Sequence, residues 1–107
     1  TGRALDPSHH SRNVCVFADG EIDRSATGSG VSARAALHHA RGELTLNQSI
    51  TIESILGTTM TVAAVEETNF GGFPGVVPEV SGTASFTGRH EFLFDPTDPL
   101  REGFIFR

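Results

Sequence analysis

The chain has 107 residues, a formal net charge of -5 and a single cysteine, so we expect one domain over residues 1–107 with one modest core. The acidic balance leaves no basic stripe to neutralise phosphates, which argues against nucleic acid as a partner. No apolar run approaches the length of a membrane span, and no signal peptide opens the chain, so no membrane partner is expected. One cysteine gives no disulfide framework and is typical of a reducing, cytoplasmic compartment.

The predicted elements begin with a strand. In "NVCVFADGEID", Asn13, Cys15 and Phe17 alternate with apolar residues of the other face, and a turn follows at Asp19–Gly20. This pattern predicts a strand and the start of its hairpin.

A helix is predicted next, from about Gly30 to Arg41, with Gly42 as its C-terminal stop. Its expected apolar positions are Ala33, Ala36, Leu37, Ala40 and then Leu44, whereas Arg34, His38 and Arg41 form a polar stripe. Short apolar or alternating runs follow, separated by glycines: "SITIESIL", "TMTVAAVEE", "FPGVVPEV", "TASFTG" and "HEFLF". Roughly six to eight short strands and one helix indicate an α+β fold, with a curved sheet around the helix. The tail "DPTDPLREGF" is typical of turns.

The stretch "DRSATGSG" precedes the predicted helix and carries the strongest local signal for a site. Successive N–H groups at Gly28, Ser29 and Gly30 can converge on an anion at the positive end of the helix dipole. Asp23, five residues earlier, would repel an anion but can hold a cationic nitrogen. Together they suit a zwitterion such as an amino acid. The alternative is a tight turn whose residues only cap the helix.

A dinucleotide site is a second interpretation, because residues 28–33 match G-x-G-x-x-A and Glu53 is an acidic residue downstream. The context argues against it. The fingerprint should leave a strand directly, whereas "DGEIDRSA" intervenes here.

Two histidine pairs, His9–His10 and His38–His39, suggest a metal site. Adjacent helical residues point about 100° apart, so His38 and His39 cannot readily share one ion. No metal ligand is therefore predicted.

Several separated motifs together resemble the C-terminal portion of the proline racemase family. They are "VFADGEIDRSATGSGVSARAALHHARGEL", "ESILGT", "VPEVSGTASFTG" and "DPLREGF", and the likeness covers nearly all of the chain from Asn13 onward. The resemblance implies half of a two-lobed enzyme of the diaminopimelate epimerase-like fold, each half wrapping strands around a central helix. The family comprises proline racemases, 4-hydroxyproline epimerases and trans-3-hydroxy-L-proline dehydratases.

The family loop of the racemases and epimerases reads D-R-S-P-C-G-T-G, and its Cys is one of two thiols acting on opposite faces of the substrate α-carbon. Thr27 stands at the position of that Cys, as in the dehydratase branch, and Ala26 replaces the usual Pro. Racemisation needs two groups that ionise near neutral pH; a thiol of pKa about 8.5 can be tuned to this, and a Thr hydroxyl cannot. The resemblance therefore implies a dehydratase, in which one thiol removes the α-proton and protonates the departing 3-hydroxide. No metal or cofactor is required.

The resemblance also assigns the site residues. Asp23 would bind the ring nitrogen, the backbone of Gly28 and Ser29 the substrate carboxylate, Phe17 would pack against the ring, and Thr27 would occupy the acid/base position. Taken alone, Phe17 is better explained as a core side chain and Asp23 as a hairpin or capping residue. Cys15 does not align with a catalytic Cys and is expected to be a buried, inert thiol.

The first catalytic thiol of the family belongs to the half that precedes the residues of this chain. We therefore expect the chain alone to be inactive, and to need the N-terminal half of the same enzyme or a second chain, as in a homodimer. Besides this half, the expected partner is an imino acid. The alternatives are a proline racemase or 4-hydroxyproline epimerase, and a module that binds an imino acid without turning it over.

Overall fold

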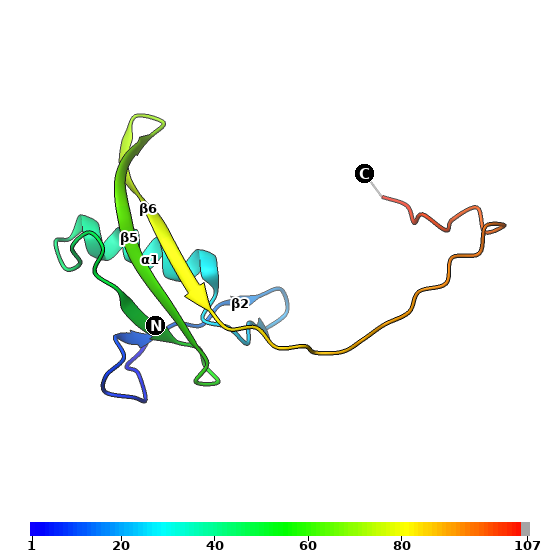
Figure 1. Ribbon diagram of the computed structural model, residues 1–107, viewed down its shortest axis with the longest axis horizontal. Coiled ribbons are helices and arrows are strands. Elements are labelled where there is room, and N and C mark those ends of the chain that lie inside the picture. Colours follow the sequence, from blue (N-terminus) through cyan, green and yellow to red (C-terminus); the bar gives the residue numbers. More distant parts are fainter. Residues whose placement is uncertain (106–107) are drawn as a thin grey trace.

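The computed structural model describes residues 1–105, which form one helix and two sheets. The larger sheet has the strand order β1-β4-β5-β6, made from β1 (Ser11–Arg12), β4 (Ile50–Glu53), β5 (Thr59–Phe70) and β6 (Phe73–Gly82). The smaller sheet is the hairpin of β2 (Val16–Phe17) and β3 (Glu21–Ile22). The helix α1 runs from Gly28 to Ala40. This mixture confirms the expected α+β class (Figure 1).

The larger sheet is built on one long hairpin. β5 and β6 are antiparallel throughout, with a bulge between Ala64 and Glu66, and β4 pairs with the first part of β5. β1 lies parallel to β4 at the other edge. β6 is the second edge strand and contains Pro74 and Pro78.

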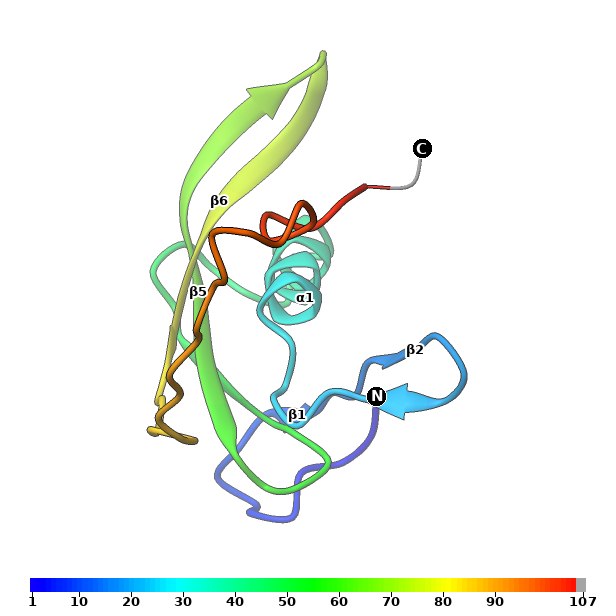
Figure 2. The same cartoon turned by 90° about the vertical axis from the view of Figure 1, so that its right-hand side faces the viewer.

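One face of the sheet packs against α1 through a small core. Figure 2 looks along the helix and shows β5 and β6 passing on one side of it. The buried cluster comprises Ala26, Val31, Ala35, Leu44, Ile50, Ile52 and Val62. Of the predicted apolar positions, Leu44 is buried. The prediction is wrong for Ala33, Leu37 and Ala40, which are exposed because Val31 and Ala35 face the sheet instead. Within residues 1–105 the helix is therefore covered on one side and not enclosed, and Leu37 is 45% exposed.

The N-terminal segment is tied to the sheet by the buried carboxylate of Glu53, which is 2% exposed. Its oxygens accept the backbone N–H groups of Leu5 and Asp6 at 2.8 and 2.9 Å, and the His9 Nδ1 lies 2.9 Å from Oε1. The two backbone donors, followed by His9, lower the pKa of Glu53 to about 2. This carboxylate is thus fully engaged by its own chain and does not serve as the ribose ligand of a nucleotide site.

The predicted first strand is much shorter than expected. Within residues 13–23, strand pairing is confined to the short hairpin of β2 and β3. The turn of this hairpin contains Ala18 and Gly20, both at positive φ. Cys15 lies outside these strands and is partly buried, so the expectation of a buried thiol is wrong. Asn13, by contrast, is buried.

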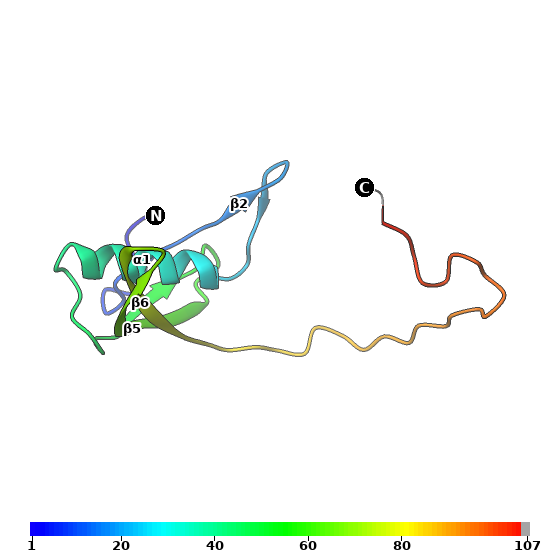
Figure 3. The same ribbon diagram turned by 90° about the horizontal axis from the view of Figure 1, so that it is seen from above.

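Residues 83–105 form an extended arm that runs away from the sheet and helix (Figure 3). The strands predicted for "TASFTG" and "HEFLF" are not formed, because these segments have no neighbouring strand to pair with. The turns predicted near the end are present, for example where Arg101 N donates to the Asp98 carbonyl. No helix among residues 1–105 has the length and apolar character that crossing a membrane requires.

Candidate active site

The loop before α1 is organised by the Asp23 carboxylate. Its Oδ1 accepts the backbone N–H of Ser25 at 2.8 Å and the Ser25 hydroxyl at 2.9 Å. Its Oδ2 accepts the Thr27 hydroxyl at 3.0 Å. Two residues that the sequence assigned to one site, Asp23 and Thr27, are thus in direct contact.

These donors keep the Asp23 carboxylate ionised. The N–H of Ser25, then the hydroxyls of Ser25 and Thr27, lower the pKa of Asp23 below its ordinary value. The carboxylate is therefore an anion at neutral pH. Since a carboxylate has about four lone-pair sites and Oδ2 accepts one bond here, it can still accept an N–H from a cationic ligand.

The start of α1 offers backbone donors beside this anion. Thr27 occupies the N-cap position but makes no side-chain capping bond, because its hydroxyl is directed to Asp23. The N–H groups of Gly28, Ser29 and Gly30 are the first three of the helix and have no partner within it. No acidic residue lies in the first turn. These N–H groups lie at the positive end of the helix dipole and can donate to an anionic group.

A hollow of about 310 Å³ adjoins this loop. Asp23, Ser25 and Ala26 form one wall. Met60 lines the hollow from β5, and Thr58 and Thr83 line it from the segments next to the sheet strands. Thr58 also donates its hydroxyl to the Arg24 carbonyl at 3.2 Å, which ties the loop to the turn between β4 and β5.

The hydrogen bonds of the loop do not test the packing predicted between Phe17 and a substrate ring. Phe17 lies on β2 of the small hairpin, and 48% of it is exposed. Its packing against a substrate ring stays a prediction.

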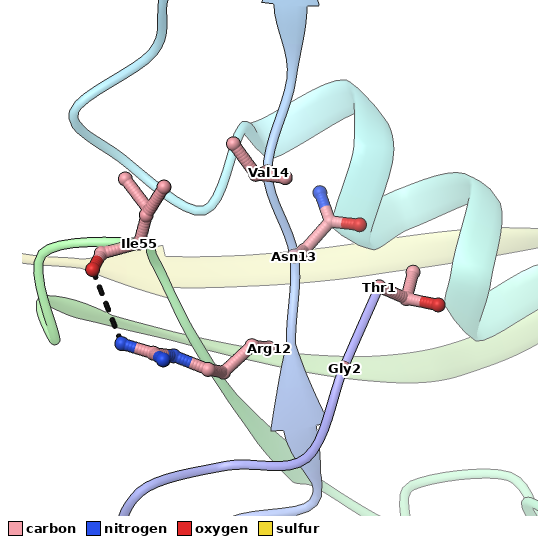
Figure 4. Close-up of a pocket in the computed structure, with 6 residues that line it drawn as sticks. All are labelled: Thr1, Gly2, Arg12, Asn13, Val14 and Ile55. Atoms are coloured by element: carbon pink, nitrogen blue, oxygen red, sulfur yellow. Dashed lines mark hydrogen bonds between the residues drawn. The ribbon is translucent and has the colours of Figure 1, made fainter.

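Two residues without a predicted role in the site, Asn13 and Ser25, shape this loop. The Asn13 Nδ2 donates to the Ala26 carbonyl at 2.8 Å in a buried contact, and the Ser25 Oγ accepts the Thr27 N–H at 3.0 Å. Figure 4 shows the Asn13 side chain pointing to the first turn of α1. A polar residue inside an apolar alternation was the signal for Asn13, because buried amides are nearly always hydrogen-bonded. For Ser25 the signal was its place two residues after an Asp, where Asx turns form.

A smaller hollow of about 210 Å³ is drawn in Figure 4. Arg12 forms part of its wall and donates from Nη2 to the Ile55 carbonyl at 3.1 Å. Neither Asp23 nor Thr27 lines this hollow, so it is separate from the candidate site.

The histidines are engaged with neighbouring groups. His38 Nδ1 lies 2.6 Å from the Glu43 carboxylate, His39 Nε2 lies 3.0 Å from Glu67, and the rings of His10 and His38 meet edge to face at 4.9 Å. In the part of the chain that the structure describes, no group of three or more His, Cys, Asp or Glu is placed to hold a metal ion.

Comparison with known proteins gives a consistent assignment. The family model described as "Proline racemase" matches residues 1–105. A trans-3-hydroxy-L-proline dehydratase of Colwellia psychrerythraea is 55% identical over 98 residues, covering 92% of this chain and 28% of that protein. A proline racemase of Clostridioides difficile is 43% identical over 105 residues, covering 95% and 31%.

The fold also matches solved structures. A hydroxyproline epimerase from Agrobacterium vitis, with bound trans-4-hydroxy-L-proline, superposes with a TM-score of 0.76 at 35% identity, covering 97% of this chain and 30% of that one. The expected diaminopimelate epimerase-like fold is thereby confirmed. The chain corresponds to the C-terminal part of these relatives and spans about 30% of their length.

Proposed function

The chain belongs to the proline racemase family, and from this premise we propose that it is the C-terminal part of a trans-3-hydroxy-L-proline dehydratase. We call the longer protein, in which the preceding lobe completes the site, the full-length enzyme. The isolated chain is expected to be inactive, because its single cysteine, Cys15, lies outside the loop that organises the site.

Substrate binding follows from the charges of the loop. The Asp23 carboxylate accepts a hydrogen bond from the charged ring nitrogen. The N–H groups of Gly28 and Ser29 donate to the substrate carboxylate and stabilise the charge that develops on it when the α-proton leaves. Phe17 packs against the ring.

The reaction is a syn elimination of water. A thiolate from the preceding lobe removes the α-proton, and the electron pair of the C–H bond forms the Cα–C3 double bond. The bond from C3 to the hydroxyl breaks, and the thiol returns its proton to the departing hydroxide. The enamine product then tautomerises to a cyclic imine. Atoms and electrons balance without an oxidant or a cofactor.

The observation that carries this proposal is the hydrogen bond of the Thr27 hydroxyl. Its hydroxyl donates to Asp23 at 3.0 Å, and an alcohol has no accessible ionised form near neutral pH. The residue supports the nitrogen-binding carboxylate and supplies no proton to the substrate. The identity of 55% with a dehydratase points the same way.

The alternative is an isomerase. It is favoured by the likeness to a proline racemase and to a hydroxyproline epimerase. In that case a proton would have to reach the α-carbon from the face where Thr27 lies.

The test is product analysis of the full-length enzyme and its Thr27→Cys variant by chiral chromatography. We expect the unmodified enzyme to dehydrate trans-3-hydroxy-L-proline and to leave the α-configuration of proline and 4-hydroxyproline unchanged. Thr27→Cys should gain slow racemisation or epimerisation, because the new thiol can ionise but is not tuned. Thr27→Ser is the matched control and should gain none. Efficient epimerisation by the unmodified enzyme would overturn the proposal in favour of the isomerase.

A further inference from the structure

The peptide group between Ala26 and Thr27 is held from both ends. Its carbonyl oxygen accepts the Asn13 Nδ2–H at 2.8 Å, and its N–H donates to the Ser25 Oγ at 3.0 Å. Because C=O and N–H of a trans peptide point in opposite directions, these two bonds together fix the orientation of the peptide plane.

This orientation maintains a backbone conformation that Thr27 would otherwise avoid. Thr27 has φ 65° and ψ 105°, outside the regions that a β-branched residue ordinarily occupies. Rotation of the Ala26–Thr27 peptide would relieve this strain. The same rotation would move the Thr27 N–H away from the Ser25 Oγ, and the Ser25 hydroxyl is one of the groups that hold the Asp23 carboxylate, at 2.9 Å.

Asn13 is rigid enough to prevent that rotation. It is 8% exposed, and its own N–H donates to the Glu53 carbonyl at 2.9 Å, which fixes its backbone to the sheet. Its side chain also depends on Gly30. A Cβ placed on Gly30 would lie 2.9 Å from the Asn13 Nδ2, closer than real Cβ atoms approach such an atom. Gly30 therefore makes room for the Asn13 amide.

We propose that Asn13 is a positioning residue of the active site: its amide holds the Ala26–Thr27 peptide, so that Thr27 and Asp23 keep the arrangement in which they meet the substrate. Gly30 is needed for the same contact, because only a residue without a side chain leaves space for the Asn13 amide. The inference rests on the proposed function for its catalytic consequence, and on the contacts above for its structural part.

The structural part is tested by a double-mutant cycle on the thermal midpoint of the full-length enzyme. Gly30→Ala should lower the midpoint when Asn13 is present. In the Asn13→Ala background the same change should leave the midpoint unchanged or raise it, because alanine is the better helix former once the clash is gone. If Gly30→Ala lowered the thermal midpoint equally with and without Asn13, the proposed contact would be overturned.

The catalytic part is tested by kcat and KM for trans-3-hydroxy-L-proline. Asn13→Ala should lower kcat/KM at least about tenfold, and Asn13→Asp, which keeps the size but replaces the donor, should do the same. If Asn13→Ala does not fold, kcat and KM are measured for Asn13→Asp and Gly30→Ala instead. Asn69→Ala, at the tip of the β5–β6 hairpin, is the control and should leave both constants unchanged.

A positioning role predicts a specific coupling. Since Asn13 acts through the loop that carries Asp23, Asn13→Ala should reduce kcat/KM much less in an Asp23→Asn background than alone. Independent, multiplicative losses would show that Asn13 only supports the fold. If the unmodified enzyme epimerises instead of dehydrating, the proposed function fails, and the same cycle read on the epimerisation still tests Asn13.

Discussion

Two carboxylates, Glu53 and Asp23, each gather several hydrogen-bond donors, but the origin of those donors differs. Glu53 is bound by residues 44 to 48 positions away in the sequence. Asp23 is bound by Ser25 and Thr27, within four positions. A carboxylate bonded by distant residues joins parts of the fold, whereas one bonded by its neighbours shapes a single loop. Stability should therefore depend on Glu53, and activity on Asp23.

The largest effect is expected from Glu53→Gln. The amide would keep one acceptor oxygen and place an NH₂ group among donors, so one of the two backbone N–H groups that now donate to Glu53, those of Leu5 and Asp6, would lose its acceptor. We expect the thermal midpoint of the full-length enzyme to fall by roughly 10 °C, measured by differential scanning calorimetry. Glu67→Gln is the control, because the Glu67 side chain is 70% exposed, and it should change little. Equal midpoints for the two variants would remove the distinction between a tertiary anchor and a surface ion pair.

Asp23→Asn should show the opposite pattern. The neutral amide cannot neutralise a charged ring nitrogen, so kcat/KM for trans-3-hydroxy-L-proline should fall roughly 30-fold or more. The thermal midpoint should move by only a few degrees, because the bonds lost lie within one partly exposed loop. Steady-state kinetics with a melting curve on the same sample checks both. If Asp23→Asn had a much lower thermal midpoint but an unchanged kcat/KM, the roles assigned to the two carboxylates would be reversed.

The smallest effect concerns acid. The folded pKa of Glu53 is lowered from 4.5 to about 2, so the stability it contributes is fully present above pH 4.5 and is lost as the pH falls toward 2. Denaturant unfolding between about pH 6 and pH 3 should show the unmodified enzyme losing stability more steeply than Glu53→Gln in the acid range. If the unfolding free energies of the two proteins fell in parallel with pH, the acid dependence would arise from the protonation of groups other than Glu53.

The local parts of this architecture could be predicted from the sequence because their signals are local. The turn at Asp19–Gly20, the loop from Asp23 to Gly28 and the stop at Gly42, with φ 72°, each depend on a few adjacent residues. The contact of Asp23 with Thr27 also lies within four positions. The family resemblance supplied the chemistry that these signals alone left open.

The parts that were wrong or missed depend on tertiary partners. The helix carries small apolar residues on more than one face, so its sequence does not determine whether Ala33 or Ala35 faces the sheet. The Asn13 amide reaches Ala26 across 13 positions, a distance no local pattern encodes. The apolar runs of the arm, such as residues 92–94, have strand character but no strand beside them within the described chain.

The outer strand of the sheet has a consequence for self-association. β6 is an edge strand, and its two prolines, Pro74 and Pro78, are four residues apart. Backbone nitrogens four apart on a strand point to the same side, and proline is tolerated in an edge strand when its nitrogen faces away from the neighbour. The free edge thus lacks two of the N–H groups that another strand would need. Copies of the chain cannot join their sheets along an unbroken β6 ladder, which protects an exposed ten-residue strand from edge-to-edge aggregation.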